Sequence, residues 1–394
     1  MKSYTYLIVG GGMAADAAVT GIRSVDAKGT IGLIGAEPDA PYDRPPLSKA
    51  LWKDGSVESI GRKTADKAVT LHLGRTVGAL EPKQKRVRDD AGETYGYEKL
   101  LIATGGRPRR LGFGGDEEVI YFRTLNDYRR LRALTGKDRR FAVIGGGFIG
   151  SELAAALTMN GQKVTMIFPG PAVGGPVFPR ELGGFLTRYY QEKGVEILAG
   201  TKVARVEARG GAIAVTTTDR QEVEADGIVA GLGIQPNVGL AEAAGLRVDD
   251  GIIVDEFLRT SEPDIYAAGE VAAFENPALG KRLRVEHEDN ANTMGEAAGR
   301  SMAGRPEPYR HLPFFYSDLF EFGYEAVGEV DARRETFIDW KRPNEEGVIY
   351  YLDGGRVRGV LLWNIFGEVD AARALIAEPG PFTPEDLKGR LAAK

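Results

Sequence analysis

Residues 142–150 read AVIGGGFIG, and residues 7–15 carry a near-copy, LIVGGGMAA. In both stretches a short apolar run leads into a glycine turn of the form Gly-x-Gly-x-x-Gly or Gly-x-Gly-x-x-Ala. The first glycine allows a tight turn, the second lets the backbone approach a pyrophosphate, and the small third residue lets a helix pack closely on a strand. The positions are Gly10, Gly12 and Ala15 in the first turn, and Gly145, Gly147 and Gly150 in the second. Two such turns predict two dinucleotide sites.

The first turn lies inside a predicted βαβ unit. Residues 4–9 form an apolar run that predicts a strand, residues 13–25 carry Ala and Val at helical spacing, and residues 30–35 predict a second strand. An anion bound at this turn would lie on the helix N-terminus, where free N–H groups and the helix dipole favour it.

The second turn repeats the pattern within residues 141–168, where Gly161 ends the predicted helix. Gly145 follows Gly10 by 135 residues (145 − 10). This offset is too long for a solenoid repeat and suits two domains of one type.

Other segments predict further strands. Residues 99–105, 226–233 and 264–270 are apolar runs that end near glycine, as buried strands of a parallel sheet do. Residues 347–366 hold two β-rich runs around Asp-Gly-Gly, which predicts a hairpin of an antiparallel sheet, and residues 368–378 predict a closing helix.

An acidic residue at the end of the second strand of such a unit would bind ribose hydroxyls. Glu37 fills this place in the first unit, 27 residues after Gly10 (37 − 10), beyond the usual spacing of about 20. The second unit ends instead in Pro169 and Gly170, with no adjacent arginine for a 2′-phosphate. The choice between NADH and NADPH therefore stays open.

The composition excludes several kinds of chemistry. The 394 residues carry a net charge of −5, which gives no sign of nucleic-acid binding. There is no cysteine, hence no disulfide, thiolate metal site or cysteine nucleophile, and the three histidines are too scattered for a metal site. Residues 1–9 run directly into a predicted strand without a charged leader, and the sequence has no run of about 18 apolar residues. We therefore expect a cytoplasmic protein without membrane contact.

Four more stretches stand in order along the chain: PYDRPPLSKALW (41–52), LLIATGGRPR (100–109), GLGIQPN (231–237) and TSEPDIYAAGEVA (260–272). Together with the glycine turns, they resemble the FAD- and NAD(P)H-dependent reductases with two dinucleotide-binding domains, a superfamily that includes the pyridine nucleotide-disulfide oxidoreductases. The most similar branch holds ferredoxin and rubredoxin reductases, monodehydroascorbate reductase and apoptosis-inducing factor.

Three stretches resemble the apoptosis-inducing-factor side of this branch in particular. They are RVEHEDNA (284–291), FFYSDLFEFGYEAVG (314–328) and GVLLWNIF (359–366).

The resemblance implies an α/β fold with two Rossmann-like domains and a small α+β C-terminal domain. An FAD domain would comprise residues 1–112 and 234–304, an inserted NAD(P)H domain residues 113–233, and the C-terminal domain residues 305–394. Relatives that reduce disulfides, or peroxide through a reactive cysteine, need a redox-active thiol. Because this chain has no cysteine, we expect electrons to leave the flavin for an external acceptor.

The resemblance also implies residue roles. Lys49 matches a lysine that lies against the flavin, and Glu152 matches the glutamate that pairs with it. From the sequence alone, Lys49 also fits a solvated surface lysine, and Glu152 a glutamate in the first turn of a helix, where the dipole favours it.

Four other residues match positions near the flavin. Arg44 would contact the FAD phosphates, and Phe148 would cover the flavin where nicotinamide stacks, unless it packs between helix and sheet. Glu270 stands where the family usually has Asp holding the ribityl chain, and Glu is one methylene longer. Tyr316 would close the ring pocket or pack in the core.

Glu286 and His287 match a Glu-His pair near the nicotinamide and the flavin ring, and with Lys49 and Glu152 they form the predicted catalytic set. The predicted cofactor-binding positions are Gly10, Gly12, Ala15, Glu37, Arg44, Lys49, Ala103, Thr104, Gly105, Gly145, Gly147, Phe148, Gly150, Gly233, Gly269, Glu270 and Tyr316.

The function implied is that of a reductase with FAD as cofactor and NADH or NADPH as substrate, passing electrons to a ferredoxin or rubredoxin. Quinone, oxygen or monodehydroascorbate are alternative acceptors, and a redox-sensing protein with a long-lived charge-transfer complex is the alternative of another class. The basic runs at residues 107–110, 129–132 and 281–284 could steer an acidic redox protein, the last being nearest the Glu-His segment. We expect a monomer or homodimer.

Overall fold

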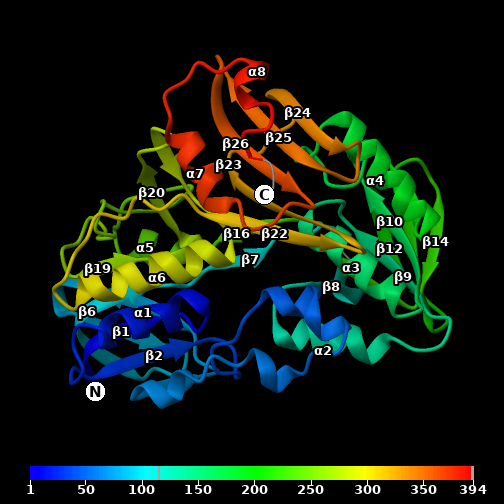
Figure 1. Cartoon of the computed structure of the whole chain (residues 1–394). Helices are drawn as coiled ribbons and strands as arrows, with labels where there is room; N and C mark the ends of the chain where they lie inside the picture. The colour runs from blue at the N-terminus through cyan, green and yellow to red at the C-terminus, as the bar shows by residue number, and fades with distance from the viewer. Residues whose placement is uncertain (114–115, 392–394) are drawn as a thin grey trace. The chain divides into compact units, whose positions relative to one another are not determined.

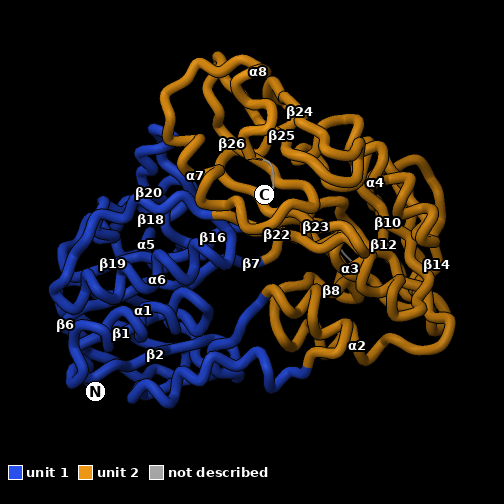
Figure 2. Tube along the Cα trace, viewed as in Figure 1, with its two compact units in different colours: residues 1–44, 56–107, 235–313 blue, residues 45–55, 108–234, 314–394 orange. Residues whose placement is uncertain are grey.

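The structure, a computed structural model, describes residues 1–113 and 116–391 (Figure 1). The chain divides into two compact units (Figure 2). Unit 1 comprises residues 1–44, 56–107 and 235–313, and unit 2 comprises residues 45–55, 108–234 and 314–394. Residues 114–115 and 392–394, which fall in two of the three predicted domains, lie outside the described residues. The three-domain boundaries stay a prediction.

Unit 1 is built on a sheet of seven strands in the order β3-β2-β1-β6-β5-β4, with β19 also paired to β6. The parallel strands are β1 (Lys2–Val9), β2 (Ile31–Gly35), β3 (Val69–Leu73), β6 (Thr94–Ile102) and β19 (Ile265–Ala267), and the antiparallel ones are β4 (Val77–Glu81) and β5 (Arg86–Asp89). Their apolar side chains form one core with the helices of this unit.

Two helices of unit 1 pack unusually closely. α1 (Met13–Arg23) and α6 (Glu288–Met302) run side by side in Figure 1. A Cβ on Gly21 would lie 2.1 Å from the Glu296 carbonyl oxygen, and one on Gly299 would lie 2.1 Å from the Ala18 carbonyl oxygen. Only glycine therefore lets these backbones touch.

Unit 2 contains a sheet of five parallel strands, ordered β11-β10-β9-β15-β8. Its strands are β8 (Val119–Tyr121), β9 (Arg140–Ile144), β10 (Lys163–Phe168), β11 (Glu196–Ala199) and β15 (Gly227–Ala230), and its helices are α2 (Leu125–Leu134), α3 (Phe148–Met159) and α4 (Arg180–Glu192). A small antiparallel sheet of β12 (Val203–Arg209), β13 (Ala212–Thr217) and β14 (Glu222–Ala225) packs onto the same core.

The C-terminal part of unit 2 is a five-stranded antiparallel sheet, ordered β22-β23-β26-β25-β24. The strands are β22 (Phe314–Leu319), β23 (Phe322–Gly328), β24 (Glu335–Arg342), β25 (Glu346–Asp353) and β26 (Arg356–Trp363), followed by α7 (Val369–Ala377) and α8 (Pro384–Leu387). The predicted hairpin is confirmed as β25 and β26, whose turn places Gly354 and Gly355 at φ +56° and +76°.

The remaining elements are short. They are β7 (Gly106–Pro108) and β16 (Ile234–Pro236), which pair with each other, α5 (Gly239–Ala243), β17 (Val248–Asp249), β18 (Gly251–Ile253), β20 (Ala272–Asn276) and β21 (Lys281–Leu283), besides 3-10 turns. Within residues 1–113 and 116–391, no helix combines the length and apolar character needed to span a bilayer.

Candidate functional site

The first glycine turn has the geometry of an anion cradle. Gly10 has φ +134°, and a Cβ there would lie 2.1 Å from the Ala103 carbonyl oxygen, so glycine is required. Gly12 precedes α1 without a side-chain cap, and a Cβ on it would meet nothing within 4 Å. Open space over an uncapped helix N-terminus fits the pyrophosphate of a dinucleotide. The third position, Ala15, is fully buried.

The second turn has the same design. Gly145 has φ +112°, and a Cβ there would lie 2.4 Å from the Gly231 carbonyl oxygen. A Cβ on Gly150 would lie 1.9 Å from the Gly145 carbonyl oxygen, so the helix can approach the strand only with glycine here. Gly147 again precedes an uncapped helix, α3, and faces open space.

Glu37, the predicted ribose ligand, is held by two neighbours in unit 1. Tyr42 Oη donates to Glu37 Oε2 at 2.6 Å, and the Arg44 guanidinium donates to Oε1. Burial alone would lower the pKa of Arg44, but Tyr42, Glu37 and, less strongly, Glu270 outweigh it and raise that pKa. The carboxyl of buried Glu270 therefore acts electrostatically on Arg44, which brings these predicted residues together.

Other predicted positions shape the backbone around this unit. Thr104 Oγ1 donates to the Asn237 carbonyl oxygen at 2.9 Å, and Asn237 Nδ2 donates back to the Thr104 carbonyl oxygen at 2.9 Å. The glycines 105, 233 and 269 all have positive φ, at +61°, +80° and +77°. These positions fix turns at strand ends, and their contact with a cofactor stays a prediction.

The Lys49–Glu152 pair predicted from the resemblance is formed within unit 2. Lys49 Nζ lies 2.6 Å from Glu152 Oε1, and Glu152 is only 3% exposed. Ser48 and Ser317 also donate to this carboxylate. The interpretation of Lys49 as a solvated surface lysine is wrong, because its side chain is 12% exposed and ion-paired.

Glu152 does not occupy the first turn of its helix. α3 begins at Phe148, which places Glu152 in the second turn, buried beside β22. Phe148 is 38% exposed, and its ring meets Phe315 edge-on at 5.2 Å. Tyr316 is 37% exposed, with its ring centroid 5.2 Å from Lys49 Nζ, so it does not pack in the core. Two exposed aromatic side chains and a paired lysine thus belong to one surface of unit 2.

Glu286 and His287 lie in unit 1, just before α6. Glu286 forms an ion pair with Arg284 at 2.9 Å. Burial lowers the pKa of His287 to about 4, with Asp289 opposing this shift, so the imidazole is neutral at pH 7. A neutral imidazole can donate or accept a hydrogen bond, but it contributes no charge.

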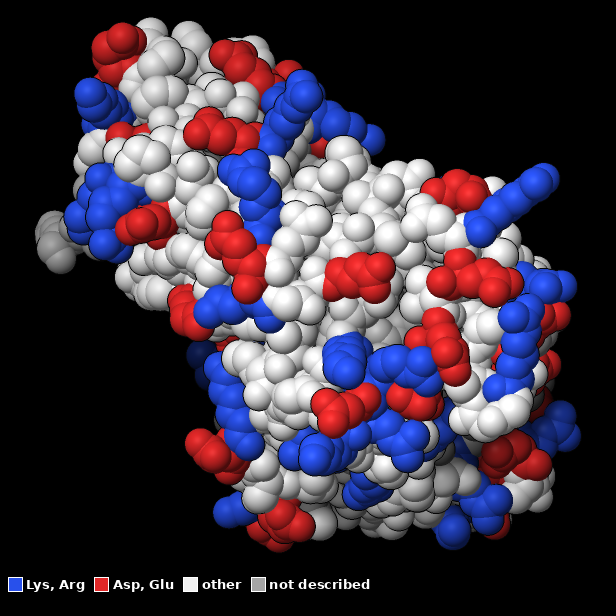
Figure 3. All heavy atoms as spheres, turned by 90° about the vertical axis from the view of Figure 1, so that its right-hand side faces the viewer, with Lys and Arg blue, Asp and Glu red and all other residues white. Residues whose placement is uncertain are grey.

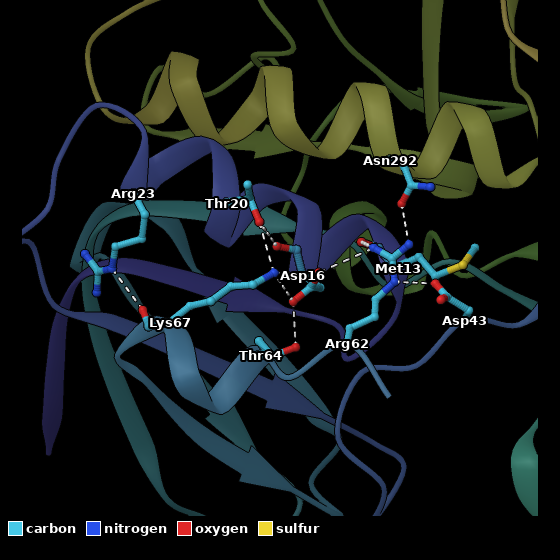
Figure 4. Close-up of polar contacts among 9 residues, drawn as sticks. All are labelled: Met13, Asp16, Thr20, Arg23, Asp43, Arg62, Thr64, Lys67 and Asn292. Atoms are coloured by element: carbon cyan, nitrogen blue, oxygen red, sulfur yellow. Dashed lines mark hydrogen bonds and ion pairs between the residues drawn. The ribbon is translucent and has the colours of Figure 1, made fainter. Parts of the chain in front are cut away.

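Sequence reasoning missed a buried polar cluster behind the first glycine turn (Figure 4). Asp16 of α1 accepts hydrogen bonds from Thr64 at 2.6 Å and Lys67 at 2.8 Å. Arg62 joins Asp16, at 3.4 Å, to Asp43 at 2.6 Å and to Asn292 of α6 at 2.7 Å. Because Asp43 precedes Arg44, this cluster ties the FAD-binding segments predicted in unit 1 to one another.

Arginines of two basic runs form ion pairs, and one of them is Arg110 with Asp116. The Arg284 side chain is only 9% exposed and pairs with Asp250 and Glu286, so its charge is neutralised within unit 1. Arg282 pairs with Glu275. The side of unit 2 that carries α4, β12 and β14 shows interspersed basic and acidic side chains in Figure 3. Pairs such as Arg209–Glu207 account for part of this mixture. A docking surface for a redox protein stays a prediction.

Two glycine turns of this geometry, each in a unit that joins parallel strands through a helix, are typical of oxidoreductases that use a flavin and a nicotinamide nucleotide. The chain belongs to the pyridine nucleotide-disulphide oxidoreductase family, whose model matches residues 4–295. A second model, for the C-terminal domain of mitochondrion-associated apoptosis-inducing factor, matches residues 338–378. The family implies FAD and NAD(P)H as cofactors, and the open cradles at Gly12 and Gly147 fit this implication.

Similar proteins agree with this assignment. The chain is 38% identical to the ferredoxin–NAD(+) reductase component of the anthranilate 1,2-dioxygenase system from Burkholderia cepacia, with 98% of this chain and 97% of the relative covered. It is 36% identical to apoptosis-inducing factor 1 from Dictyostelium discoideum, with 98% and 80% covered.

A solved structure of the covalent putidaredoxin reductase–putidaredoxin complex matches with a TM-score of 0.90 at 31% identity, covering 98% of this chain and 95% of that chain. The predicted α/β fold and membership of the branch are confirmed, and the chain is an oxidoreductase.

Proposed function

We propose that the protein is an FAD-dependent reductase that oxidises NADH or NADPH and passes electrons to a small iron–sulfur or iron protein, a ferredoxin or rubredoxin. The observation that carries this proposal is the pair of open, uncapped glycine turns at Gly12 and Gly147. The ferredoxin reductase relatives support the choice of acceptor.

Each unit contributes defined groups to this reaction. In unit 1, Gly10 and Gly12 shape the FAD pyrophosphate site, Glu37 holds the ribose, and Arg44 offers a charge-assisted donor to phosphate. Bound FAD supplies the conversion between two-electron hydride chemistry and single-electron delivery.

In unit 2, Gly147 and the α3 N-terminus bind the nicotinamide nucleotide. Lys49, held by Glu152, provides a fixed positive charge and a hydrogen-bond donor for the flavin ring, and exposed Phe148 and Tyr316 offer aromatic faces. None of these roles needs a thiol, in agreement with the absence of cysteine.

The test begins with the purified chain. It should be yellow, with the absorbance near ~450 nm that bound FAD gives, and NADH or NADPH should bleach it anaerobically. Mixing the reduced protein with ferredoxin, rubredoxin, quinone or monodehydroascorbate then ranks the acceptors. A colourless protein that cannot be reconstituted with FAD would refute the proposal.

A second candidate function is redox sensing of the apoptosis-inducing-factor type, which the match over residues 338–378 favours. Slow turnover with every acceptor, a long-wavelength absorbance band that persists in air, and a change from monomer to dimer on reduction would favour this alternative. Fast turnover with a ferredoxin or rubredoxin would exclude it.

A further inference from the structure

The carboxylate of Glu152 accepts hydrogen bonds from three separate side chains of unit 2. Ser48 Oγ donates to Oε2 at 2.6 Å, while Lys49 Nζ and Ser317 Oγ both donate to Oε1 at 2.6 Å. Oε1 is therefore shared between an ammonium and a hydroxyl. Ser317 comes from β22, far along the chain from the other donors.

These contacts are almost closed to solvent. Ser317 is 1% exposed, and Ser48 and Glu152 are also buried. A buried carboxylate is costly unless its oxygens are satisfied. Because so little of its surface is exposed, the two hydroxyls take the place of solvent, one on each oxygen. Together they determine the plane in which the carboxylate presents Oε1 to Lys49.

The register between β22 and α3 brings Ser317 to this position. Phe315 meets Phe148, and Ser317 meets Glu152, so two residues along the strand match four along the helix. A step of two strand residues spans about 7 Å, and a step of four helix residues about 6 Å. The contact between the Phe315 and Phe148 rings fixes the register of the strand on the helix, and this register places the Ser317 hydroxyl beside Glu152.

Two buried tyrosines near the Glu152 carboxylate carry neutral phenols. Burial, followed by the charge of Glu152, raises the pKa of Tyr190 and Tyr324 well above the usual range. Both side chains stay protonated at pH 7, so no phenolate competes with Glu152 for the Lys49 ammonium. Ser317 also interacts with the Tyr324 hydroxyl.

On the basis of the proposed function, we propose that Ser317 is a positioning residue of the electron-transfer site. Its hydroxyl fixes Oε1 of Glu152 and, through that oxygen, the ammonium of Lys49. The preceding residue, Tyr316, faces the same ammonium with its ring. The C-terminal sheet thereby sets the position of the charge that tunes the flavin, and it does so through the Ser317 hydroxyl and the Tyr316 ring.

The first test measures the midpoint potential of the bound flavin in wild type, Ser317→Ala, Ser317→Thr, Lys49→Met and the S317A/K49M double variant. We expect S317A to shift the potential in the wild-type background and to leave it unchanged in the K49M background, because Ser317 acts through Lys49. The Ser317→Thr variant keeps the hydroxyl and should therefore have the wild-type midpoint potential. Equal shifts in both backgrounds, or no shift in either, would overturn the positioning role.

A second readout needs no flavin. Urea unfolding of the apoprotein should show that S317A costs less stability in a Glu152→Gln background than in wild type. Ser151→Ala is the matched control, because Ser151 adjoins Glu152 but bonds the Gly147 and Phe148 carbonyl oxygens. Additive effects of S317A and E152Q would contradict the contact.

The two ideas fail in different ways. If the wild-type chain cannot bind FAD, the proposed function falls, and the positioning role falls with it. If the chain binds and reduces FAD while S317A acts independently of Lys49, only the positioning role falls.

Discussion

Lys49 Nζ lies 2.6 Å from Oε1 of Glu152, a residue 103 positions away in the sequence. The partners come from the segment that precedes β3 and from the helix that follows the second glycine turn, so the pair joins two motifs that the sequence presents separately. Removing one member of a buried pair leaves the other uncompensated, at a cost of about 3–5 kcal/mol.

Lys49→Met should slow reduction of the flavin by NAD(P)H by at least about tenfold, because a preorganised charge near the reacting ring is lost. Stopped-flow absorbance measures this rate directly. Lys53→Met is the control, since Lys53 lies in the same segment and is exposed. If K49M reduced its flavin at the wild-type rate, Lys49 would have no role in this step.

Alanine substitutions at Gly12 and at Gly10 of the first turn should affect different properties, FAD affinity in one case and protein stability in the other. Gly12→Ala meets open space in the protein, so the apoprotein should unfold at the wild-type temperature while FAD binds at least about tenfold more weakly. Gly10→Ala clashes with the Ala103 carbonyl oxygen and should destabilise the apoprotein itself.

Gly78→Ala, in β4 with nothing nearby and no positive φ, serves as the control for Gly12→Ala. Gly147→Ala should weaken binding of the nicotinamide nucleotide and leave the affinity for FAD unchanged. Differential scanning fluorimetry and flavin titration separate the outcomes, and unchanged FAD affinity in G12A would exclude this cradle.

Arg62 and Lys67 should differ in their effect on FAD retention although both bond Asp16. Arg62→Met also releases Asp43 and Asn292, whereas Lys67→Met disturbs α1 only. We expect R62M to release FAD faster than K67M when both variants are compared at matched stability. Recovery of free-flavin fluorescence reports the release rate. Identical rates would limit Arg62 to a structural role.

The pKa of His287 predicts a loss of stability in acid. Its pKa is about 4 in the folded chain, below the ordinary 6.5, so the unfolded state binds the proton more readily. This contribution is complete above pH 6.5, falls as the pH drops towards 4, and amounts to at most about 3 kcal/mol. Urea unfolding of wild type and His287→Asn at pH 7.5 and 4.5 tests this. The variant should lose less stability between the two pH values, and an equal loss would contradict the shift.

Gly170→Glu should raise the ratio of kcat/KM for NADH over NADPH by about tenfold or more, because an acid at this place binds ribose hydroxyls and repels a 2′-phosphate. The space exists, since a Cβ on Gly170 would meet only one atom, 3.8 Å away. Gly170→Ala controls for the loss of glycine. An unchanged ratio of kcat/KM for the two nucleotides would show that the ribose does not bind beside residue 170.

Local patterns predicted the elements around both glycine turns. α1 begins at the predicted residue, α3 ends two residues before the predicted Gly161, and β2, β10 and β25 end within a residue or two of the expected places. These elements follow from short-range rules: an apolar run, a glycine turn, then helical periodicity. The Lys49–Glu152 pair followed from family resemblance rather than from these rules.

The rest depends on partners distant in the sequence. α6 contains Gly295 and Gly299, which weaken helix propensity, and it forms because those glycines allow close packing on α1. Ser317 and Glu152 are 165 residues apart, so no local pattern connects them. The cluster around Asp16 could not be predicted for the same reason, and neither could the ion pair between Arg284 and Asp250.

The contact between α1 and α6 also determines the order in which the chain can mature on the ribosome. Residues 13–23 are made early, but the helix that covers them, residues 288–302, emerges only after nearly three-quarters of the chain. Domains generally fold as units once their residues are available. The amino-terminal βαβ unit must therefore wait, with an apolar face uncovered, until most of unit 2 has been synthesised. A nascent chain halted before α6 would be a natural client for a chaperone that shields apolar surface.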